Sequence, residues 1–305
     1  MVIGRDPDCT EARDAVMESC VLAGEDHNGP GPCPGGLDPG LAGPVPLAEL
    51  QEALALARIR TLYQPIVRIR DRAPVAVEVL ARLAHPTRGL VEPDLFVPQF
   101  EEAGLALPLT EAVARLAFGE WHAGALEQLG ISLALNFPLD VLLMPAALNW
   151  LDRERERAGI PAHRVTIELT ESRPVSRLAE LGAAVSRLRR AGYQLAIDDV
   201  GPDLRDHREL LALEFSSLKL DKNLVQDAMR SPVAAAFLDR ASAAARQAGM
   251  LVVAEGVADA EIWARVAALP VDQAQGYFVA RPMAAASVAD WQSAWLERPP
   301  FVRLS

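Results

Sequence analysis

Ionisable and amide side chains stand in, or at the end of, most of the short apolar segments that the sequence predicts to be strands. A buried charge is costly unless it is paired or binds a metal ion. A single residue of this kind is compatible with a satisfied polar group in a core, but its recurrence in seven predicted strands indicates a functional site. The residues are Glu78, Asn136, Glu168, Asp198, Asp199, Lys219, Glu255 and Gln275.

The chemistry of this set suits a hard divalent cation. Carboxylate oxygens and the amide oxygen of Asn136 are the kind of ligand that Mg²⁺ or Mn²⁺ prefers. The three cysteines all lie within the first 33 residues, and no histidine ends a predicted strand. The sequence therefore favours magnesium or manganese over zinc.

The elements that must position these residues alternate between short apolar strands and amphipathic helices. Such alternation predicts a largely parallel sheet covered by helices, and eight strands close it into a modified (β/α)₈ TIM-type barrel of the α/β class. In such barrels the active site lies at the carboxyl ends of the strands. We predict strands at 62–69, 75–80, 132–137, 165–169, 194–198, 216–220, 251–254 and 271–275, and helices at 47–58, 93–103, 108–129, 175–191, 233–248 and 259–267.

The first 46 residues differ in composition from the rest. Residues 24–46 contain seven glycines and six prolines, which is typical of a linker without regular structure. We therefore predict a flexible, disordered tail and linker at 1–46 and the barrel domain at 47–305. Within the tail, 10–22 is compatible with a short amphipathic helix. A mobile tail is the favoured interpretation, and a regulatory or protein-binding arm that uses Cys9, Cys20 and Cys33 is the alternative.

Bulk composition excludes several classes of function. Half of the 305 residues are hydrophobic, 23% are charged and the net charge is −11. A protein that binds duplex nucleic acid through its phosphates normally carries a basic excess. We find no signal-peptide pattern and no apolar run of the ~18 residues needed to cross a bilayer, and we expect a cytoplasmic protein without a membrane partner.

The same residues, taken in order with their neighbours, resemble the EAL-domain family of cyclic-di-GMP phosphodiesterases, and the resemblance covers about three quarters of the chain. The signature triplet reads Glu78-Val79-Leu80, with valine where alanine is usual. The matching elements are Gln64-Pro-Ile66, Glu78-Val-Leu-Ala-Arg82, His85-Pro86, Leu135-Asn136, Glu168-Leu-Thr-Glu171, Asp198-Asp199, Lys219-Leu-Asp221, Ala254-Glu-Gly-Val257 and Gln275-Gly-Tyr277.

The resemblance implies a two-metal site and a role for each catalytic residue. One metal is bound by the positions of Glu78, Asn136, Glu168 and Asp198, and the second by Asp198 and Asp199. A water between the two metals loses a proton easily and attacks phosphorus in line. Lys219 holds this nucleophile, and Glu255, positioned by Gln275, orients the waters of the second metal or accepts a proton.

The resemblance also implies how the substrate, the bacterial second messenger cyclic di-GMP, is bound and cleaved to linear pGpG. Gln64 meets the guanine end, Arg82 contacts a phosphate, and Asp221 belongs to the substrate-binding set. Glu171 anchors the loop that follows Asp198-Asp199, a loop that the family links to its dimer interface. A homodimer and a protein partner for the tail are both compatible with this family.

The loop after Asp198-Asp199 departs from the family pattern Phe-Gly-Thr-Gly-Tyr-Ser-Ser. Here the chain continues Val200-Gly-Pro-Asp-Leu-Arg-Asp206, and Gly201 is the one match. Pro202 fixes its own φ and removes an N–H, so the loop follows a different path. We therefore expect slow turnover. The alternatives are a catalytically silent cyclic-di-GMP receptor that signals through a protein partner, a protein-interaction module, and an unrelated metal-dependent barrel enzyme.

Overall fold

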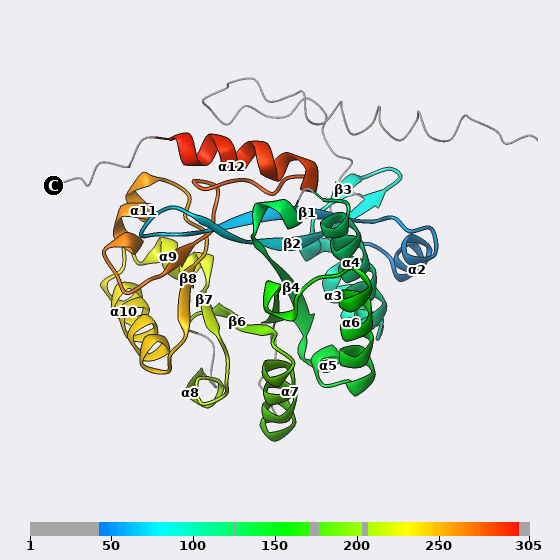
Figure 1. The fold of residues 1–305 in the computed structure, drawn as a ribbon, viewed down its shortest axis with the longest axis horizontal. Coiled ribbons are helices and arrows are strands. Elements are labelled where there is room, and N and C mark those ends of the chain that lie inside the picture. The colour runs from blue at the N-terminus through cyan, green and yellow to red at the C-terminus, as the bar shows by residue number, and fades with distance from the viewer. Residues whose placement is uncertain (1–42, 125, 171–176, 203–206, 299–305) are drawn as a thin grey trace, which may run out of the picture. The chain divides into compact units, whose positions relative to one another are not determined.

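The computed structural model describes residues 43–298, except 125, 171–176 and 203–206. In this part of the chain, eight strands close a barrel, as the sequence predicts, in the order β1-β9-β8-β7-β6-β5-β4-β2 with β2 returning to β1 (Figure 1). They are β1 (Ile59–Arg68), β2 (Pro74–His85), β4 (Ser132–Pro138), β5 (Val165–Thr170), β6 (Gln194–Val200), β7 (Ser217–Leu220), β8 (Leu251–Ala254) and β9 (Gln273–Ala274).

One strand distinguishes this barrel from a fully parallel one. β1 runs antiparallel to both of its neighbours, β2 and β9, whereas β2, β4 and the strands up to β9 pair in parallel. β3 (Gly89–Val91) pairs antiparallel with the outer end of β2 and forms a hairpin with it. The carboxyl ends of seven parallel strands therefore meet at one mouth of the barrel.

Helices lie between the strands and cover the outside of the barrel. The predicted helices are present with shifted ends, and α5, α6, α8, α9, α12 and the 3₁₀ helices η4 and η5 are additional to those predicted. The helices are α2 (Leu47–Ala55), η2 (Pro93–Leu95), α3 (Val97–Glu102), α4 (Ala106–His122), η3 (Glu127–Leu129), α5 (Leu139–Leu142), α6 (Pro145–Arg157), η4 (Ala162–Arg164), α7 (Leu178–Arg190), α8 (His207–Leu210), α9 (Lys222–Asp227), α10 (Pro232–Gln247), α11 (Ala260–Ala267), η5 (Ala285–Ser287) and α12 (Val288–Glu297). No helix in the described ranges is both long enough and apolar enough to cross a membrane.

Several predictions fall on residues outside the described ranges. These are the helix at 10–22, the three cysteines, Glu171 and the centre of the loop after Asp199. The division of the chain at residue 46 stays a prediction. Next to that division, Val45 is 1% exposed and its N–H donates to Leu95 O at 3.1 Å. Residues 43–46 are thus in contact with the barrel domain.

The loops that follow β8 and β9 cross with their backbones in contact. Val257 N donates to Gln275 O, and Phe278 N donates to Val257 O, both at 3.0 Å. Gly276 has φ +152°, and a Cβ atom on it would lie 2.2 Å from Val257 O. Only glycine fits at this crossing. The contact between the two loops therefore holds Gln275 next to the loop that carries Glu255.

Replacing Gly276 with alanine should destabilise the fold by roughly 3 kcal/mol or more, because the backbones must separate and the conformation is strained. Gly249→Ala is the matched control. Gly249 also has a positive φ, +79°, but a Cβ there meets nothing within 4 Å, so roughly 1–2 kcal/mol of strain is expected. Urea unfolding measures the loss of unfolding free energy in both variants. Equal losses in the two variants would show that the two loops are not in tight contact at Gly276.

Candidate functional site

Charged side chains from five strands converge at the carboxyl mouth of the barrel, around Lys219 of β7. The Lys219 ammonium lies 2.9 Å from Glu168 Oε2 of β5, 2.9 Å from Asp198 Oδ1 of β6 and 2.6 Å from Glu255 Oε1 after β8. Glu78 Oε2 of β2 is 3.6 Å away. The lysine is 1% exposed, and three close carboxylates match its three N–H donors.

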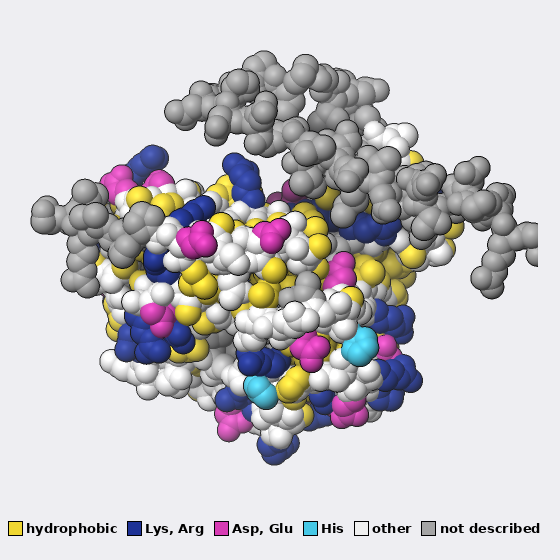
Figure 2. All heavy atoms as spheres, turned by 45° about the horizontal axis from the view of Figure 1, so that its top comes forward, with side chains coloured by type: hydrophobic (Ala, Val, Ile, Leu, Met, Phe, Trp, Pro, Cys, Tyr) yellow, Lys and Arg dark blue, Asp and Glu magenta, His cyan; other side chains and the backbone are white. Residues whose placement is uncertain are grey.

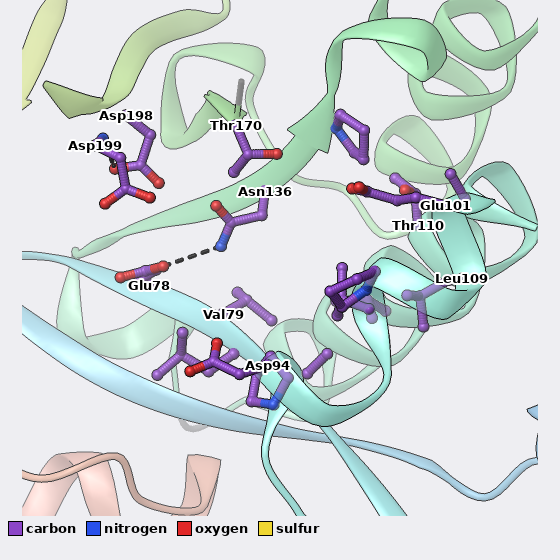
Figure 3. A pocket seen from close by; sticks show the side chains of 18 of the residues that line it. Glu78, Val79, Asp94, Glu101, Leu109, Thr110, Asn136, Thr170, Asp198 and Asp199 are labelled. Carbon is purple, nitrogen blue, oxygen red and sulfur yellow. Dashed lines mark hydrogen bonds between the residues drawn. The ribbon is translucent and has the colours of Figure 1, made fainter. Parts of the chain in front are cut away.

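Asp199 joins the cluster because β6 is irregular at this point. Consecutive residues of a regular strand point to opposite faces, but the β6–β7 register shifts between Ile197 and Val200. Asp199 takes the left-handed conformation with φ +51°, which aspartate tolerates better than most residues. As a result Asp198 and Asp199 both line the same cleft (Figure 3).

Amide side chains hold Glu78 from two sides. Asn136 Nδ2 of β4 donates to Glu78 Oε1 at 2.9 Å, and Gln275 Nε2 donates to Glu78 Oε2 at 2.7 Å. Gln275 also reaches Gln64 Oε1 at 3.3 Å, and Gln64 Nε2 donates to Ala280 O. We expected Gln275 to position Glu255, but its amide contacts Glu78 and Gln64 instead.

Burial and mutual repulsion raise the pKa of most of these carboxyl groups. Burial, and then the charge of Asp198, raises the pKa of Asp199 to about 6. Burial raises the pKa of Glu255 to about 8 and that of Glu168 well above its usual value, although Lys219 opposes both shifts. The pKa of Asp198 is raised by the same burial. The site therefore holds more carboxyl groups than Lys219 can neutralise, and several of them keep their protons to a higher pH than usual in the metal-free protein.

The pKa values of Lys219 and Glu78 are both shifted in the direction that favours the charged form. Burial by itself would lower the pKa of Lys219, but the surrounding carboxylates raise it well above its ordinary value. Burial would likewise raise the pKa of Glu78, yet the charge of Lys219 and the hydrogen bonds from Asn136 and Gln275 lower it. On the outer face shown in Figure 2, acidic and basic side chains lie interspersed.

The donor set fits two adjacent divalent cations. Carboxylate oxygens of Glu78, Glu168 and Asp198 lie within 4.8 Å of one another, and so do those of Asp198, Asp199 and Glu255. Asp198 belongs to both groups. All of these ligand atoms are hard oxygens, as Mg²⁺ and Mn²⁺ require, and divalent cations would replace the protons that the clustered carboxyl groups hold.

A cleft of about 530 Å³ opens beside the cluster, within the size range of small-ligand sites. One side carries Glu78, Asn136, Asp198, Asp199 and Glu255. The opposite wall was missed by the sequence analysis, because its apolar spacing is indistinguishable from that of an ordinary core helix. Figure 3 shows Glu101, Leu109 and Thr110 on this wall. The wall consists of Pro93, Asp94, Val97, Pro98, Glu101, Ala106, Leu109, Thr110 and Val113.

Two predicted substrate contacts have other partners in the structure. Arg82 is 5% exposed, and its guanidinium binds Glu92 Oε2 at 3.0 Å and donates to Ala81 O at 2.9 Å. Asp221 Oδ1 accepts from the N–H groups of Asn223 and Leu224 and so caps α9. Arg82 lies within β2, and Asp221 directly follows β7.

The EAL domain family model matches residues 47–282. The cyclic di-GMP phosphodiesterase PA2567 of Pseudomonas aeruginosa is 28% identical over 246 residues, which are 80% of this chain and 42% of that protein. An uncharacterised protein of Mycobacterium bovis is 31% identical over 242 residues, 77% of this chain and 38% of the relative. The chain therefore spans less than half the length of these relatives.

Solved structures resemble the barrel domain over most of its length. The PaMucR phosphodiesterase in complex with c-di-GMP has a TM-score of 0.74 and 25% identity, covering 79% of this chain and 98% of that one. The FimX EAL domain of Pseudomonas aeruginosa bound to c-di-GMP has a TM-score of 0.70 and 25% identity, covering 78% and 97%. With a family match over most of its length and the matching barrel, the chain belongs to the EAL domain family.

Proposed function

We propose that the chain is a metal-dependent phosphodiesterase that hydrolyses cyclic di-GMP to linear pGpG. The observation that carries this proposal is the convergence of four carboxylates on the buried Lys219 beside a cleft. The names of similar proteins, a cyclic di-GMP phosphodiesterase and a phosphodiesterase in complex with c-di-GMP, support the choice of substrate. A cytoplasmic location, where a second messenger acts, belongs to the same proposal.

The residues that would hold metal are those of the two carboxylate groups. Glu78, Asn136, Glu168 and Asp198 would hold one Mg²⁺ or Mn²⁺ ion, and Asp198 with Asp199 the other. Divalent cations bound there would supply an activated water and positive charge for the phosphate oxygens.

Lys219 and Glu255 would act on the reacting groups directly. Lys219 places a permanent positive charge in a water-poor site, where it can stabilise charge that develops on a phosphoryl oxygen. Glu255 lines the cleft with its carboxylate 2.6 Å from the ammonium. It can therefore receive the proton that the attacking water loses.

The remaining proposed contacts orient the substrate. Gln64 is held by Gln275 and by Ala280 O beside Glu78, which suits a contact to a guanine edge. Arg82 is proposed to contact a phosphate, and Asp221 to complete the substrate-binding set. For Arg82 this requires that its bond to the exposed Glu92 be shared or released.

Glu168→Ala should abolish metal-dependent hydrolysis, with a loss of at least ~10³-fold in kcat, because it removes a buried ligand of the first group. The assay follows pGpG formation with increasing Mg²⁺ or Mn²⁺, and circular dichroism checks the fold. Glu214→Gln, at an exposed glutamate of the barrel domain, is the control and should retain activity. Undiminished turnover in Glu168→Ala would refute the metal assignment. Binding of cyclic di-GMP by the native chain without any hydrolysis would instead identify a receptor.

Lys219→Met should lower kcat by at least ~100-fold at saturating metal, because the charge that stabilises the phosphoryl oxygens is lost while the side-chain length is kept. The KM for cyclic di-GMP should change little. Steady-state kinetics separate the two parameters. If KM rises with kcat unchanged, Lys219 is a ground-state contact of the substrate and not a catalytic group.

The metal-free protein should lose stability as the pH rises from about 5 to about 8. The folded chain keeps protons on Asp199, with a pKa of about 6, and on Glu255, with a pKa of about 8, after the unfolded chain has released them. The unfolded state then binds fewer protons, so the free energy of unfolding falls with rising pH. Lys219 stays charged throughout this window.

Thermal unfolding with a chelator measures this effect, and a fall on the order of 5 °C in Tm is expected. Saturating Mn²⁺ should remove most of the fall, since cations replace the protons. The Glu255→Gln variant should show a smaller fall than the native chain. A melting temperature that rises over the same interval would contradict the raised pKa values.

A further inference from the structure

The cleft lies between two hydrophobic cores that meet at the partly buried Val113. The barrel core fills the barrel and packs the surrounding helices against it, and the second core lies under α2, α3 and the β2–β3 hairpin. In Figure 1, α2, α3 and α4 lie together on one side of the barrel. Among the described residues, no buried side chain belongs to both cores. The second core consists of Val45, Leu50, Ala53, Ile59, Leu83, Val91, Phe96, Phe100 and Leu109.

The wall opposite the carboxylates is the outer surface of this second core. Phe96 and Phe100, both 0% exposed, pack edge to face beneath that wall, with ring centroids 6.1 Å apart. Leu109 belongs to the second core and also lines the cleft. Further along α4, Ala117 and Phe118 belong to the barrel core. Side chains of α4 therefore pack against both cores, and Val113 contacts the two together.

Residues 43–55 supply one side of the second core. Val45 is 1% exposed and Leu50 is 0% exposed. The Val45 N–H donates to Leu95 O at 3.1 Å, directly beneath the wall segment at 93–98, and Arg88 Nη1 donates to Gly43 O at 2.6 Å. Residues 43–55 thus share a core with the wall and are joined to its first segment by the Val45–Leu95 hydrogen bond.

A histidine fixes α2 to the hairpin. His85 Nδ1 accepts hydrogen bonds from the N–H groups of Thr87 and Arg88 at 3.2 and 3.1 Å. The proton of a neutral ring is therefore on Nε2, which donates to the Glu49 carboxylate of α2. Because Glu49 accepts in this bond, an amide oxygen at the same position would also accept it.

We propose that Val45 and Glu49 are positioning residues of the cleft. They set the place of the wall at 93–113, and they control substrate affinity without contact to the carboxylate cluster. Core packing resists continuous deformation, so a displacement of residues 43–46 moves the wall as a unit. A partner or a preceding segment that pulls on these residues thereby changes KM and leaves the chemical step intact. The substrate in this inference is that of the proposed function.

The first test compares the same substitution in the two cores. Val45→Ala should raise the KM for cyclic di-GMP roughly three- to tenfold while kcat stays within about twofold, because the wall shifts and the catalytic groups do not. Val185→Ala, at a 0% exposed valine of α7 in the barrel core, is the matched control. It should lower the melting temperature by a similar amount and leave KM unchanged.

The second test uses the histidine contact. Glu49→Ala should raise KM as Val45→Ala does, whereas Glu49→Gln keeps an acceptor for His85 Nε2 and should restore nearly native KM. If Val45 and Glu49 only stabilise the fold, then KM should change in proportion to the loss of stability in all four variants, Val45→Ala, Val185→Ala, Glu49→Ala and Glu49→Gln. That result, or a fall in kcat at constant KM in Val45→Ala, would overturn the proposal.

Hydrogen exchange on the full chain without substrate separates this inference from the proposed function. Val45→Ala should speed amide exchange in residues 93–113 and not in β5 to β7, and Val185→Ala should do the reverse. This readout decides the inference even if the native chain does not act on cyclic di-GMP. If amide exchange in residues 93–113 is unchanged in Val45→Ala, the inference that Val45 positions the wall is wrong.

Discussion

The balance of charge around Lys219 is the constraint on which the rest of the structure depends. Burying one ammonium with a surrounding set of carboxylates costs solvation energy, which the ion pairs and hydrogen bonds offset only in good geometry. Three contacts of 2.9 Å or less meet this demand at Lys219. The remaining negative charge has no cation in the described part of the chain that contacts it as closely, and a hard divalent ion is the natural complement.

Three local features of the fold produce that geometry. Parallel pairing brings the ends of β5, β6, β7 and β8 to one mouth, and the irregularity in β6 turns Asp199 to the same side as Asp198. The glycine crossing places Gln275 beside Glu78. Each feature fixes the backbone position of one side chain, and hydrogen bonds and ion pairs within the cluster hold the side chains in place.

The cleft wall is built on a different principle. It consists mostly of apolar side chains held by a small core of its own, at some distance from the ion pairs. The relatives are longer proteins, of which this chain spans less than half. Under the inference drawn from the two cores, a shift of the wall changes substrate affinity and leaves the charged half of the site in place.

The sequence by itself determined the barrel class, the eight strands and the set of charged residues at their ends. These features depend on local periodicity and on the rule that parallel strands present their carboxyl ends together. The positions of Glu78, Glu168, Asp198 and Lys219 follow directly from that rule. The tertiary structure alone decided the partner of Gln275, the left-handed bulge at Asp199 and the wall formed by Val97, Leu109 and Thr110. An amide hydrogen bond depends on how two loops cross, and a helix pattern shows that a face is apolar without showing whether it meets a core or a cleft. Only the three-dimensional packing distinguishes those cases.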